Sequence, residues 1–376
     1  MTMERFLTDQ ALAHPATGPR DIIKQCYQAA YGAEHLLADK EKAYAYLMQE
    51  YSQVSADETL PLYEAISPQV CRINLAAWKH KDLPLSWLFS MFAASASVSV
   101  DRQAAAKQFL SYLDQASVMI QTGGLPVSFS ANEWIDALND YKATAMTAVH
   151  HSDTYRQAEH PAYRIVRYEY VRLLPILEAA AAHFHAQSDT SSYSPCIIAM
   201  DGRAASGKTT MADQLATILD ADVIRMDDFF LPIALRSPER LATPGGNVHY
   251  ERFMEEVLPH LRDCQSFSYR RFDCHIIDYS GMRQIRETAT RSTVRQFPIR
   301  IVEGSYSHHP QLRDYADITV FSTVNPDVQM KRILHRNGPQ MAQMFQERWI
   351  PMEENYFQQF QIQQNANLTI DSSLLF

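Results

Sequence analysis

The sequence predicts two domains: an all-α domain over residues 1–190 and an α/β domain with a mostly parallel sheet over residues 195–376. Through most of the first half, apolar residues recur every three or four positions, which is typical of amphipathic helices. In the second half, short apolar runs alternate with helical patterns, which is typical of parallel strands with helices on both faces of the sheet. A chain of 376 residues is long enough to bury two hydrophobic cores.

The composition excludes several classes of protein. With 34 Lys and Arg against 43 Asp and Glu, the net charge is -9, so nucleic acid is not expected as a partner. No signal peptide is evident, and no stretch approaches the roughly 18 apolar residues of a membrane span. We therefore expect a cytoplasmic protein without a membrane partner. The five cysteines are scattered and never spaced as Cys-x-x-Cys, so we expect reduced thiols.

The first region is predicted to be helical from about residue 20 to residue 185. Apolar residues with helical spacing near its start are Ile22, Cys26, Ala29, Ala33 and Leu36. Asp101 can cap a helix that runs to about Gln121. Pro161 can open another helix, which Pro175 should kink or divide. The role of this domain stays unassigned.

Two short segments of this region combine residues that are uncommon in packing helices. They are residues 31–35, Tyr-Gly-Ala-Glu-His, and residues 160–164, His-Pro-Ala-Tyr-Arg. Gly32 inside a helix costs about 1 kcal/mol relative to Ala, so it marks either close helix packing or a ligand. We favour packing. The aromatic side chains of Tyr163, Tyr168 and Tyr170 are likewise interpreted as core.

A linker is predicted between residues 187 and 195, where Ser, Asp, Thr and Tyr replace the apolar pattern. After it, a buried strand at residues 196–200, a Gly-rich turn and a helix at residues 208–219 form the start of a βαβ unit. The further strands expected are residues 223–226, 299–302 and 318–321, and the further helices are residues 250–261 and 327–335.

The turn after the first strand matches the phosphate-binding loop pattern G-x-x-x-x-G-K-[ST] over residues 202–209. Its amides and the amino end of the helix attract phosphate groups, Lys208 reaches the β- and γ-phosphates, and the Thr209 hydroxyl can bind Mg²⁺. We expect Lys208 to be an exposed loop lysine. The candidate nucleotide-binding residues are Gly202, Arg203, Ala204, Ala205, Ser206, Gly207, Lys208, Thr209 and Thr210.

Carboxylates follow two of the predicted strands. Asp227 and Asp228 come after the strand at residues 223–226, and Glu303 follows the strand at residues 299–302. Because loops after parallel strands gather at one edge of the sheet, these acids should lie beside the phosphate-binding loop. One can accept a proton from a substrate hydroxyl while another orients Mg²⁺.

Residues 198–210, 226–230 and 301–304 together resemble the uridine kinase and phosphoribulokinase family, over roughly residues 195–376. The resemblance implies a P-loop kinase domain that uses ATP and Mg²⁺ to phosphorylate an alcohol on a small molecule. The Asp that opens the family's Asp-x-Phe segment is the catalytic base, which implies that role for Asp227. The Glu of the family's Glu-Gly pair belongs to the Mg²⁺ environment, which implies that role for Glu303. Together with Thr209 of the phosphate-binding loop, it gives the expected metal ligands.

Members of this family also carry a mobile lid with arginines, and residues 331–336 are similar to that stretch. Arg332 and Arg336 lie one helical turn apart, so both can face the nucleotide. The catalytic candidates are therefore Asp227, Lys208, Arg332 and Arg336.

The acceptor is open among a nucleoside, a sugar and a pantothenate-like alcohol. Uridine kinases have a Tyr-Asp-Phe segment in the nucleoside pocket, whereas this chain reads Tyr-Arg-Arg-Phe-Asp-Cys over residues 269–274. The side chains that we expect to bind the acceptor are Asp227, His249, Tyr250, Tyr269, Arg271 and Asp273.

A histidine metal site and a nucleotide-dependent switch are the alternatives to an enzyme of this kind. His183 and His185 point to different sides of a predicted helix, so a histidine metal site is disfavoured. An ATP-dependent switch, in which nucleotide binding acts on the helical domain without phosphorylating a small molecule, is the rival hypothesis. The preference for ATP over GTP and the oligomeric state, a homo-oligomer included, stay open.

Overall fold

The computed structural model describes residues 2–33, 36–187, 194–273, 276, 278–287 and 298–373. The chain divides into two compact units, Met1–Val171 and Arg172–Phe376. Among the described residues, no helix is long and apolar enough to cross a membrane. Cys26, Cys71, Cys196 and Cys264 are free thiols, and Cys274 lies outside the described residues.

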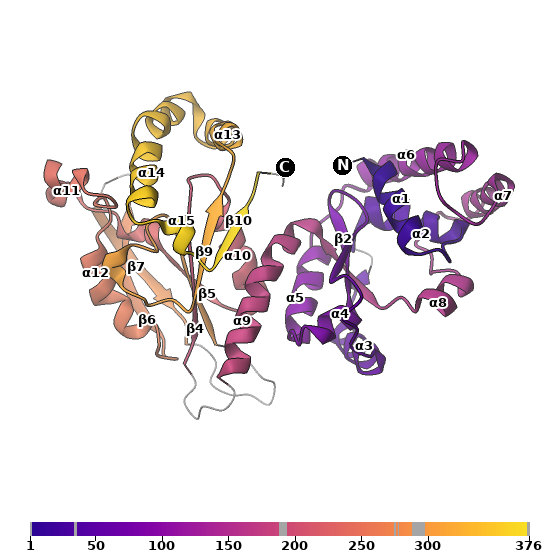
Figure 1. The fold of residues 1–376 in the computed structure, drawn as a ribbon, viewed down its shortest axis with the longest axis horizontal. Helices are drawn as coiled ribbons and strands as arrows, with labels where there is room; N and C mark the ends of the chain where they lie inside the picture. Colours follow the sequence, from indigo (N-terminus) through magenta and orange to yellow (C-terminus); the bar gives the residue numbers. More distant parts are fainter. Residues whose placement is uncertain are drawn as a thin grey trace. The chain divides into compact units, whose positions relative to one another are not determined.

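The second unit is built on a five-stranded parallel sheet with the order β10-β9-β4-β8-β5 (Figure 1). Its strands are β4 (Cys196–Gly202), β5 (Asp222–Arg225), β8 (Ile299–Glu303), β9 (Ile318–Thr323) and β10 (Leu368–Asp371). The first four match the predicted strands, and the predicted parallel sheet is confirmed. β10 and the antiparallel hairpin of β6 (Phe267–Asp273) and β7 (Asp278–Ile285) were not predicted.

Helices cover both faces of this sheet (Figure 1). The helices of the second unit are α9 (Leu174–Ala186), α10 (Lys208–Leu219), α11 (Pro238–Ala242), α12 (Tyr250–Glu256), α13 (Pro326–Met344), α14 (Ile350–Gln359) and α15 (Ile362–Asn365). On one face, Phe253 of α12 and Phe357 of α14 pack with Ile197, Val302 and Phe321 of the strands. α9 and α10 lie on the other face.

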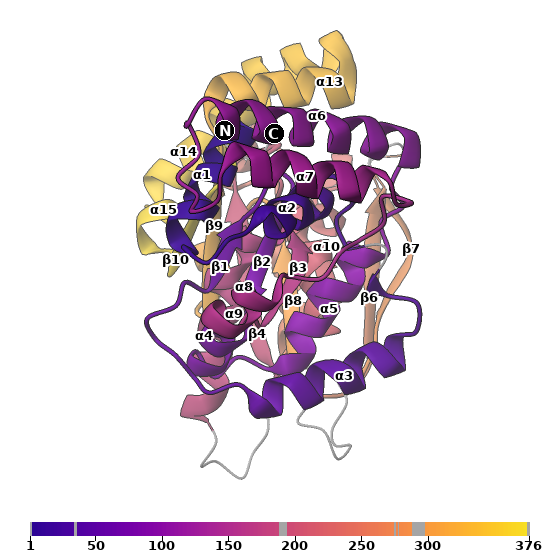
Figure 2. The same cartoon turned by 90° about the vertical axis from the view of Figure 1, so that its right-hand side faces the viewer.

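The first unit is helical, as predicted, but it also contains a small sheet that the sequence did not reveal. Its helices are α1 (Met3–Ala13), α2 (Pro19–Tyr31), α3 (Lys40–Gln53), α4 (Leu75–His80), α5 (Leu85–Ala96), α6 (Arg102–Gln121), α7 (Ala131–Lys142) and α8 (Asp153–Glu159). The strands β1 (Tyr63–Ala65), β2 (Val70–Asn74) and β3 (Tyr163–Arg167) form an antiparallel sheet with β2 in the middle. Within this unit, α2, α6 and α7 lie side by side (Figure 2).

Several local predictions can be compared directly with these elements. The Asp101 side chain accepts from the amides of Gln103 and Ala104, so it caps α6 as predicted. Pro161 opens no helix, because it lies two residues before β3, and Pro175 lies in the first turn of α9 rather than at a kink.

Gly32 was interpreted as a site of close helix packing, and this is wrong. Gly32 ends α2 with a φ of 59°, and a Cβ atom built there would meet nothing within 4 Å. The glycine is needed for the backbone turn at the helix end. The aromatic residue Tyr170 is buried, in agreement with the core interpretation.

The boundary between the two units lies before α9, whereas the sequence placed a linker at residues 187–195. α9 contacts β4 and β9, so it belongs to the second unit by its contacts. Residues 188–193 of the predicted linker lie outside the described residues.

Candidate active site

The phosphate-binding loop leaves the end of the central strand β4 and leads into α10. Gly202 has a φ of 141°, and a Cβ atom there would lie 2.0 Å from the carbonyl oxygen of Ser322 on the neighbouring strand β9. Gly207 has a φ of 85° and directly precedes the first residue of α10. Only glycine fits these two positions, so both fixed glycines of the motif have a structural reason.

Lys208 is buried rather than exposed, with 7% of its surface accessible. Its Nζ donates to the carbonyl oxygens of Gly202 at 2.7 Å and Arg203 at 2.8 Å. The side chain therefore folds back along the loop and brings its positive charge to the concave side of the motif. The expectation of an exposed lysine that contributes little to packing is wrong.

Two glutamates of α14 hold the outer part of the loop. Glu353 accepts from the amide of Ala204 at 2.9 Å and from the Ser305 hydroxyl at 2.7 Å. Glu354 accepts from the Arg203 guanidinium at 2.7 and 3.1 Å, the bidentate geometry of a strong pair. Burial raises the pKa of the Glu353 carboxyl, although Lys208 opposes this effect.

Thr209 and Glu303 are brought together as predicted from the motif and the strand order. The Thr209 hydroxyl donates to Glu303 Oε1 at 3.0 Å, and Arg225 donates to Glu303 Oε2 at 2.9 Å. The register of the parallel strands explains the contact, because Glu303 pairs with Met200 of β4 and with Arg225 of β5. The result is a cluster of oxygen atoms at the start of α10. Thr210, the next residue, is exposed.

Asp227 lies beside this oxygen cluster without a fixed partner. Solvent reaches its side chain, and among the described residues it makes no hydrogen bond or ion pair. Desolvation by the surrounding atoms raises the pKa of Asp227, and the charges of Glu303 and Asp228 raise it further, whereas Lys208 and Arg225 lower it. A carboxylate with these properties is available to accept a proton.

Asp228 differs from its neighbour because it is fully engaged. It is buried, and its Oδ2 accepts from Arg283 at 2.6 Å and from the Tyr269 hydroxyl at 3.2 Å. Arg271 lies 3.7 Å from its Oδ1. Asp228 therefore ties the β6–β7 hairpin to the sheet, and the two adjacent acids have different roles.

The candidate acceptor residues do not converge on one open surface. Tyr269 is 1% exposed, and its hydroxyl also accepts from the Arg225 amide at 3.2 Å. Because both hydrogen-bonding roles of this hydroxyl are used inside the core, the geometry argues against a direct role in acceptor binding. Arg271 keeps 53% of its side chain exposed beside Asp228, and Asp273 is half-buried at the end of β6.

His249 and Tyr250 are mainly packing residues in this structure. His249 Nδ1 lies 2.5 Å from the Tyr279 hydroxyl of the hairpin. The Tyr250 ring lies 4.1 Å from the Arg240 guanidinium and stacks on His309 at 4.9 Å. His249 therefore packs against the β6–β7 hairpin, and Tyr250 packs against residues outside it.

The two arginines of the predicted lid separate. Arg332 donates to the carbonyl oxygen of Ala205 at 3.1 Å and to the backbone of Ser372 at 2.7 Å, so it touches the phosphate-binding loop from outside. Arg336 is exposed and donates to its neighbour Asn337. α13 also breaks at Gly338, which has a φ of 77°. The two guanidinium groups do not share one target here.

A group with metal-ligand atoms lies elsewhere in the second unit. His183, Cys196 and Asp317 each place one such atom within 4.8 Å of the others. Asp317 already accepts from Arg262 at 2.6 Å and from the amide of Ile197 at 2.7 Å. Because the carboxylate is paired with a cation and the group lies at the strand ends opposite to the loop, we assign no metal to it.

Known structures are similar to this chain over about half of its length. No protein family model and no curated protein matches the sequence. A possible uridine kinase from Bacillus stearothermophilus is 16% identical, with a TM-score of 0.36, over 52% of this chain and 100% of that chain. A putative fructose transport system kinase from Silicibacter sp. TM1040 is 21% identical, with a TM-score of 0.38, over 51% of this chain and 98% of that chain.

These matches cover about half of the chain, as the resemblance in the sequence does. The second unit has a five-stranded parallel sheet covered by helices, with a phosphate-binding loop sequence between β4 and α10.

Proposed function

We propose that the second unit is an ATP-dependent kinase that transfers the γ-phosphoryl group to a hydroxyl of a small molecule. The observation that supports this most is the unengaged carboxylate of Asp227 beside the Thr209 and Glu303 oxygen atoms. A switch that only binds nucleotide needs no proton acceptor at this place, whereas phosphoryl transfer to an alcohol does.

The phosphate-binding loop would hold the triphosphate of ATP. Loop amides from Ala205 to Thr209 and the amino end of α10 supply positive potential for phosphate oxygens. The Lys208 ammonium adds a full charge, and the carbonyl oxygens of Gly202 and Arg203 fix its position. The α14 glutamates keep the outer part of the loop in place.

The oxygen atoms of Thr209 and Glu303 fit Mg²⁺, because this ion prefers oxygen ligands and keeps several waters beside them. Arg225 holds the second oxygen of Glu303 and so orients the carboxylate. When bound with ATP, Mg²⁺ offsets the charge that develops on the transferred phosphoryl group.

In the proposed reaction, Asp227 accepts the proton of the acceptor hydroxyl. The hydroxyl oxygen forms a bond with the γ-phosphorus, the bond from that phosphorus to the bridging oxygen breaks, and ADP leaves. The raised pKa of Asp227 makes it a better proton acceptor than an ordinary surface carboxylate. The acceptor class stays open among a nucleoside, a sugar and a pantothenate-like alcohol.

The test is a screen for ADP release from Mg²⁺ and ATP with a panel of nucleosides, sugars and vitamins, followed by Asp227→Asn with the best acceptor. We expect single-turnover transfer to fall about a hundredfold or more while ATP affinity is kept. Asp263→Asn, at an exposed aspartate, is the matched control. Absence of any acceptor-dependent ADP release, or unchanged transfer by Asp227→Asn, would contradict the proposal and favour the switch.

A further inference from the structure

The sheet of the first unit presents charged and polar side chains to α1 and α2, where an apolar core is the usual arrangement. Arg72 lies in the middle strand β2, opposite Glu64 of β1. From β3, the Tyr163 ring faces the Arg72 guanidinium at 4.7 Å. A charged side chain at the centre of a sheet costs several kcal/mol unless its charge is compensated.

The Arg72 guanidinium is buried without an ion pair. It is 4% exposed, and it donates to Gln28 Oε1 at 3.2 and 2.8 Å and to Gln10 Oε1 at 2.8 Å. Both partners are neutral amides. No carboxylate of the described residues lies within 4.0 Å of it. Three of its five N–H donors are used in these bonds, so two remain.

A second cation lies in the same place. Lys24 precedes Gln28 by one turn of α2, is half-buried, and donates from Nζ to the carbonyl oxygen of Val149 at 2.9 Å. Within the described ranges it too has no carboxylate at ion-pair distance. Burial lowers the pKa of Lys24 to about 8, and the nearby charge of Arg72 contributes to the shift, whereas the charge of Asp21 opposes it.

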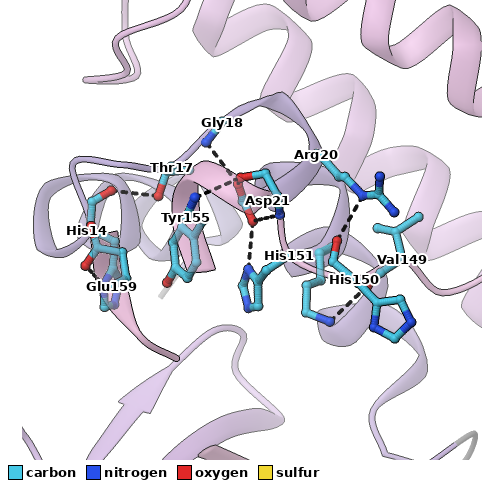
Figure 3. A network of polar contacts seen from close by, with 12 residues as sticks. His14, Thr17, Gly18, Arg20, Asp21, Val149, His150, His151, Tyr155 and Glu159 are labelled. Atoms are coloured by element: carbon cyan, nitrogen blue, oxygen red, sulfur yellow. Dashed lines mark hydrogen bonds and ion pairs between the residues drawn. The ribbon is translucent and has the colours of Figure 1, made fainter. Parts of the chain in front are cut away.

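The carboxylates nearest to these cations are committed to other groups. Asp21 accepts from His151 Nδ1 at 2.7 Å, from the Ser152 hydroxyl at 2.7 Å and from the amide of Gly18 at 3.1 Å (Figure 3). Glu64 is bonded to His14 and to Gln10. Both carboxylates are therefore held by these groups, and neither lies within 4.0 Å of the nitrogen atoms of the two cations.

From this arrangement we infer that Lys24 and Arg72 bind an oxyanion, the phosphate or carboxylate group of a small molecule, in the first unit. An oxyanion accepts several hydrogen bonds, so it can use the free N–H donors of both side chains. It would also compensate two cations that no described carboxylate pairs. This ligand group is separate from the triphosphate, because all of its contacts come from Met1–Val171.

The direct test is chemical labelling of Lys24 in the full chain. Because burial lowers the pKa of Lys24, more of this amine is unprotonated at pH 8 than of an exposed lysine, so an acylating reagent should modify it, and mass spectrometry should resolve it from other lysines. Inorganic phosphate and acetate are the two probes, with chloride at equal ionic strength as the reference. We expect one probe to slow the labelling of Lys24 about tenfold, because a bound anion covers the amine and raises its pKa. The exposed Lys107 should be labelled equally in all three salts.

Variants of Arg72 test whether the slower labelling of Lys24 is caused by an anion bound to both side chains. Arg72→Met should abolish the protection, and Arg72→Lys should keep part of it. Because Arg72→Met removes a buried side chain, circular dichroism is needed to confirm that it folds. Lys24→Gln offers a second measurement that does not depend on labelling: it should reduce the rise in unfolding temperature that the active probe gives, whereas Lys107→Gln should not.

Each outcome bears on the inference. Protection by phosphate alone identifies a phosphate site, and protection by acetate identifies a carboxylate site. Equal labelling of Lys24 in phosphate, acetate and chloride overturns the inference. An unchanged temperature shift in Lys24→Gln overturns it as well, even if both Arg72 variants fail to fold.

Discussion

The two units bury charged side chains in different ways. In the second unit, two of the buried carboxylates hold backbone amides of loops. Asp201 accepts from the amides of Tyr306 at 3.1 Å and His308 at 3.0 Å, and Glu353 accepts from the amide of Ala204 at 2.9 Å. These bonds fix the shape of loops at the carboxyl ends of the strands, and they leave Asp227 free.

In the first unit, the buried charges are joined mainly through side chains of different elements, although Asp21 also accepts from the amides of Gly18 and Ser152. Asp21 binds the ring of His151, whose Nε2 lies 2.7 Å from the Tyr163 hydroxyl, and Arg72 binds two glutamines. Such a network fixes helices against a sheet. The difference teaches that substitutions in the second unit should mainly change a site, whereas substitutions and pH in the first unit should mainly change stability.

The largest expected effect concerns where the second unit begins. α9 buries Ile176, Leu177 and Phe184, and it contacts β4 and β9. Removing it would expose apolar surface worth several kcal/mol. We expect a fragment of residues 172–376 to fold and bind ATP, and a fragment of residues 195–376 to aggregate or unfold. If the shorter fragment has the same unfolding temperature and ATP affinity, the domain boundary predicted from the sequence is the better one.

A second effect should appear in the phosphate-binding loop. We expect Lys208→Ala to lower ATP turnover by about a hundredfold or more, because the ammonium charge at the phosphates is lost. Since two loop carbonyls also lose their donor, the variant should be less stable by about 1 to 3 kcal/mol. Turnover and thermal unfolding should be measured together, with Lys107→Ala as control. Normal ATP turnover in Lys208→Ala would contradict the assignment of residues 202–209 as a phosphate-binding loop.

The features that the sequence predicted correctly are mostly local ones. The strands of the second unit and the loop after β4 are contiguous patterns, and so is the Asp101 cap of α6. The parallel strand order also predicted that Glu303 lies near Thr209, and this prediction required no side-chain contact to be known. These features need only short-range rules and one rule of topology.

What the sequence did not predict depends on distant partners. β2 and β3 are five residues each, separated by almost ninety positions, and each is held as a strand by its partner. The contact of Glu353 with Ala204 spans 149 positions, and no local pattern on α14 marks that glutamate. Tyr269 looked like a polar pocket residue because its contact with Asp228 is also non-local.

A third prediction tests the side-chain network of the first unit. Asp21→Asn keeps the volume but places an amide donor among the groups that donate to Asp21, so it should destabilise this unit by about 1 to 3 kcal/mol. Three of the four tryptophans, Trp78, Trp87 and Trp134, belong to this unit, so fluorescence reports its unfolding. ATP affinity should not change. Asp9→Asn is the control, because its ion pair with Arg5 is exposed.

The smallest and most specific effect should be the pH dependence of that unfolding. Burial lowers the pKa of His151 from 6.5 to about 4, and the charges of Arg72 and Lys24 lower it further, whereas the hydrogen bond to Asp21 opposes the shift. The unfolded chain therefore binds more protons than the folded chain between these values. Stability from His151 is complete above pH 6.5 and is lost as the pH falls toward 4, by at most about 3 kcal/mol.

His14 has the opposite sign. Burial alone lowers its pKa, but the hydrogen bonds with Glu64 and Glu159 outweigh this and raise it. Its stabilisation is complete below pH 6.5 and is lost above, as the pH passes its folded pKa. The second unit also holds a buried histidine with a lowered pKa, His309. A difference in pH dependence between the two units would therefore not identify His151 as its cause.

The decisive comparison is therefore His151→Gln against His150→Gln, at an exposed neighbour. Glutamine can donate to Asp21 and accept from Tyr163 without titrating. We expect His151→Gln to flatten the fall in the fluorescence-monitored unfolding free energy between pH 6.5 and 4, and His150→Gln to leave it unchanged. A slope that survives in His151→Gln would show that the side-chain network does not set the pH response of the first unit, and the contrast between the units would then rest on the site substitutions alone.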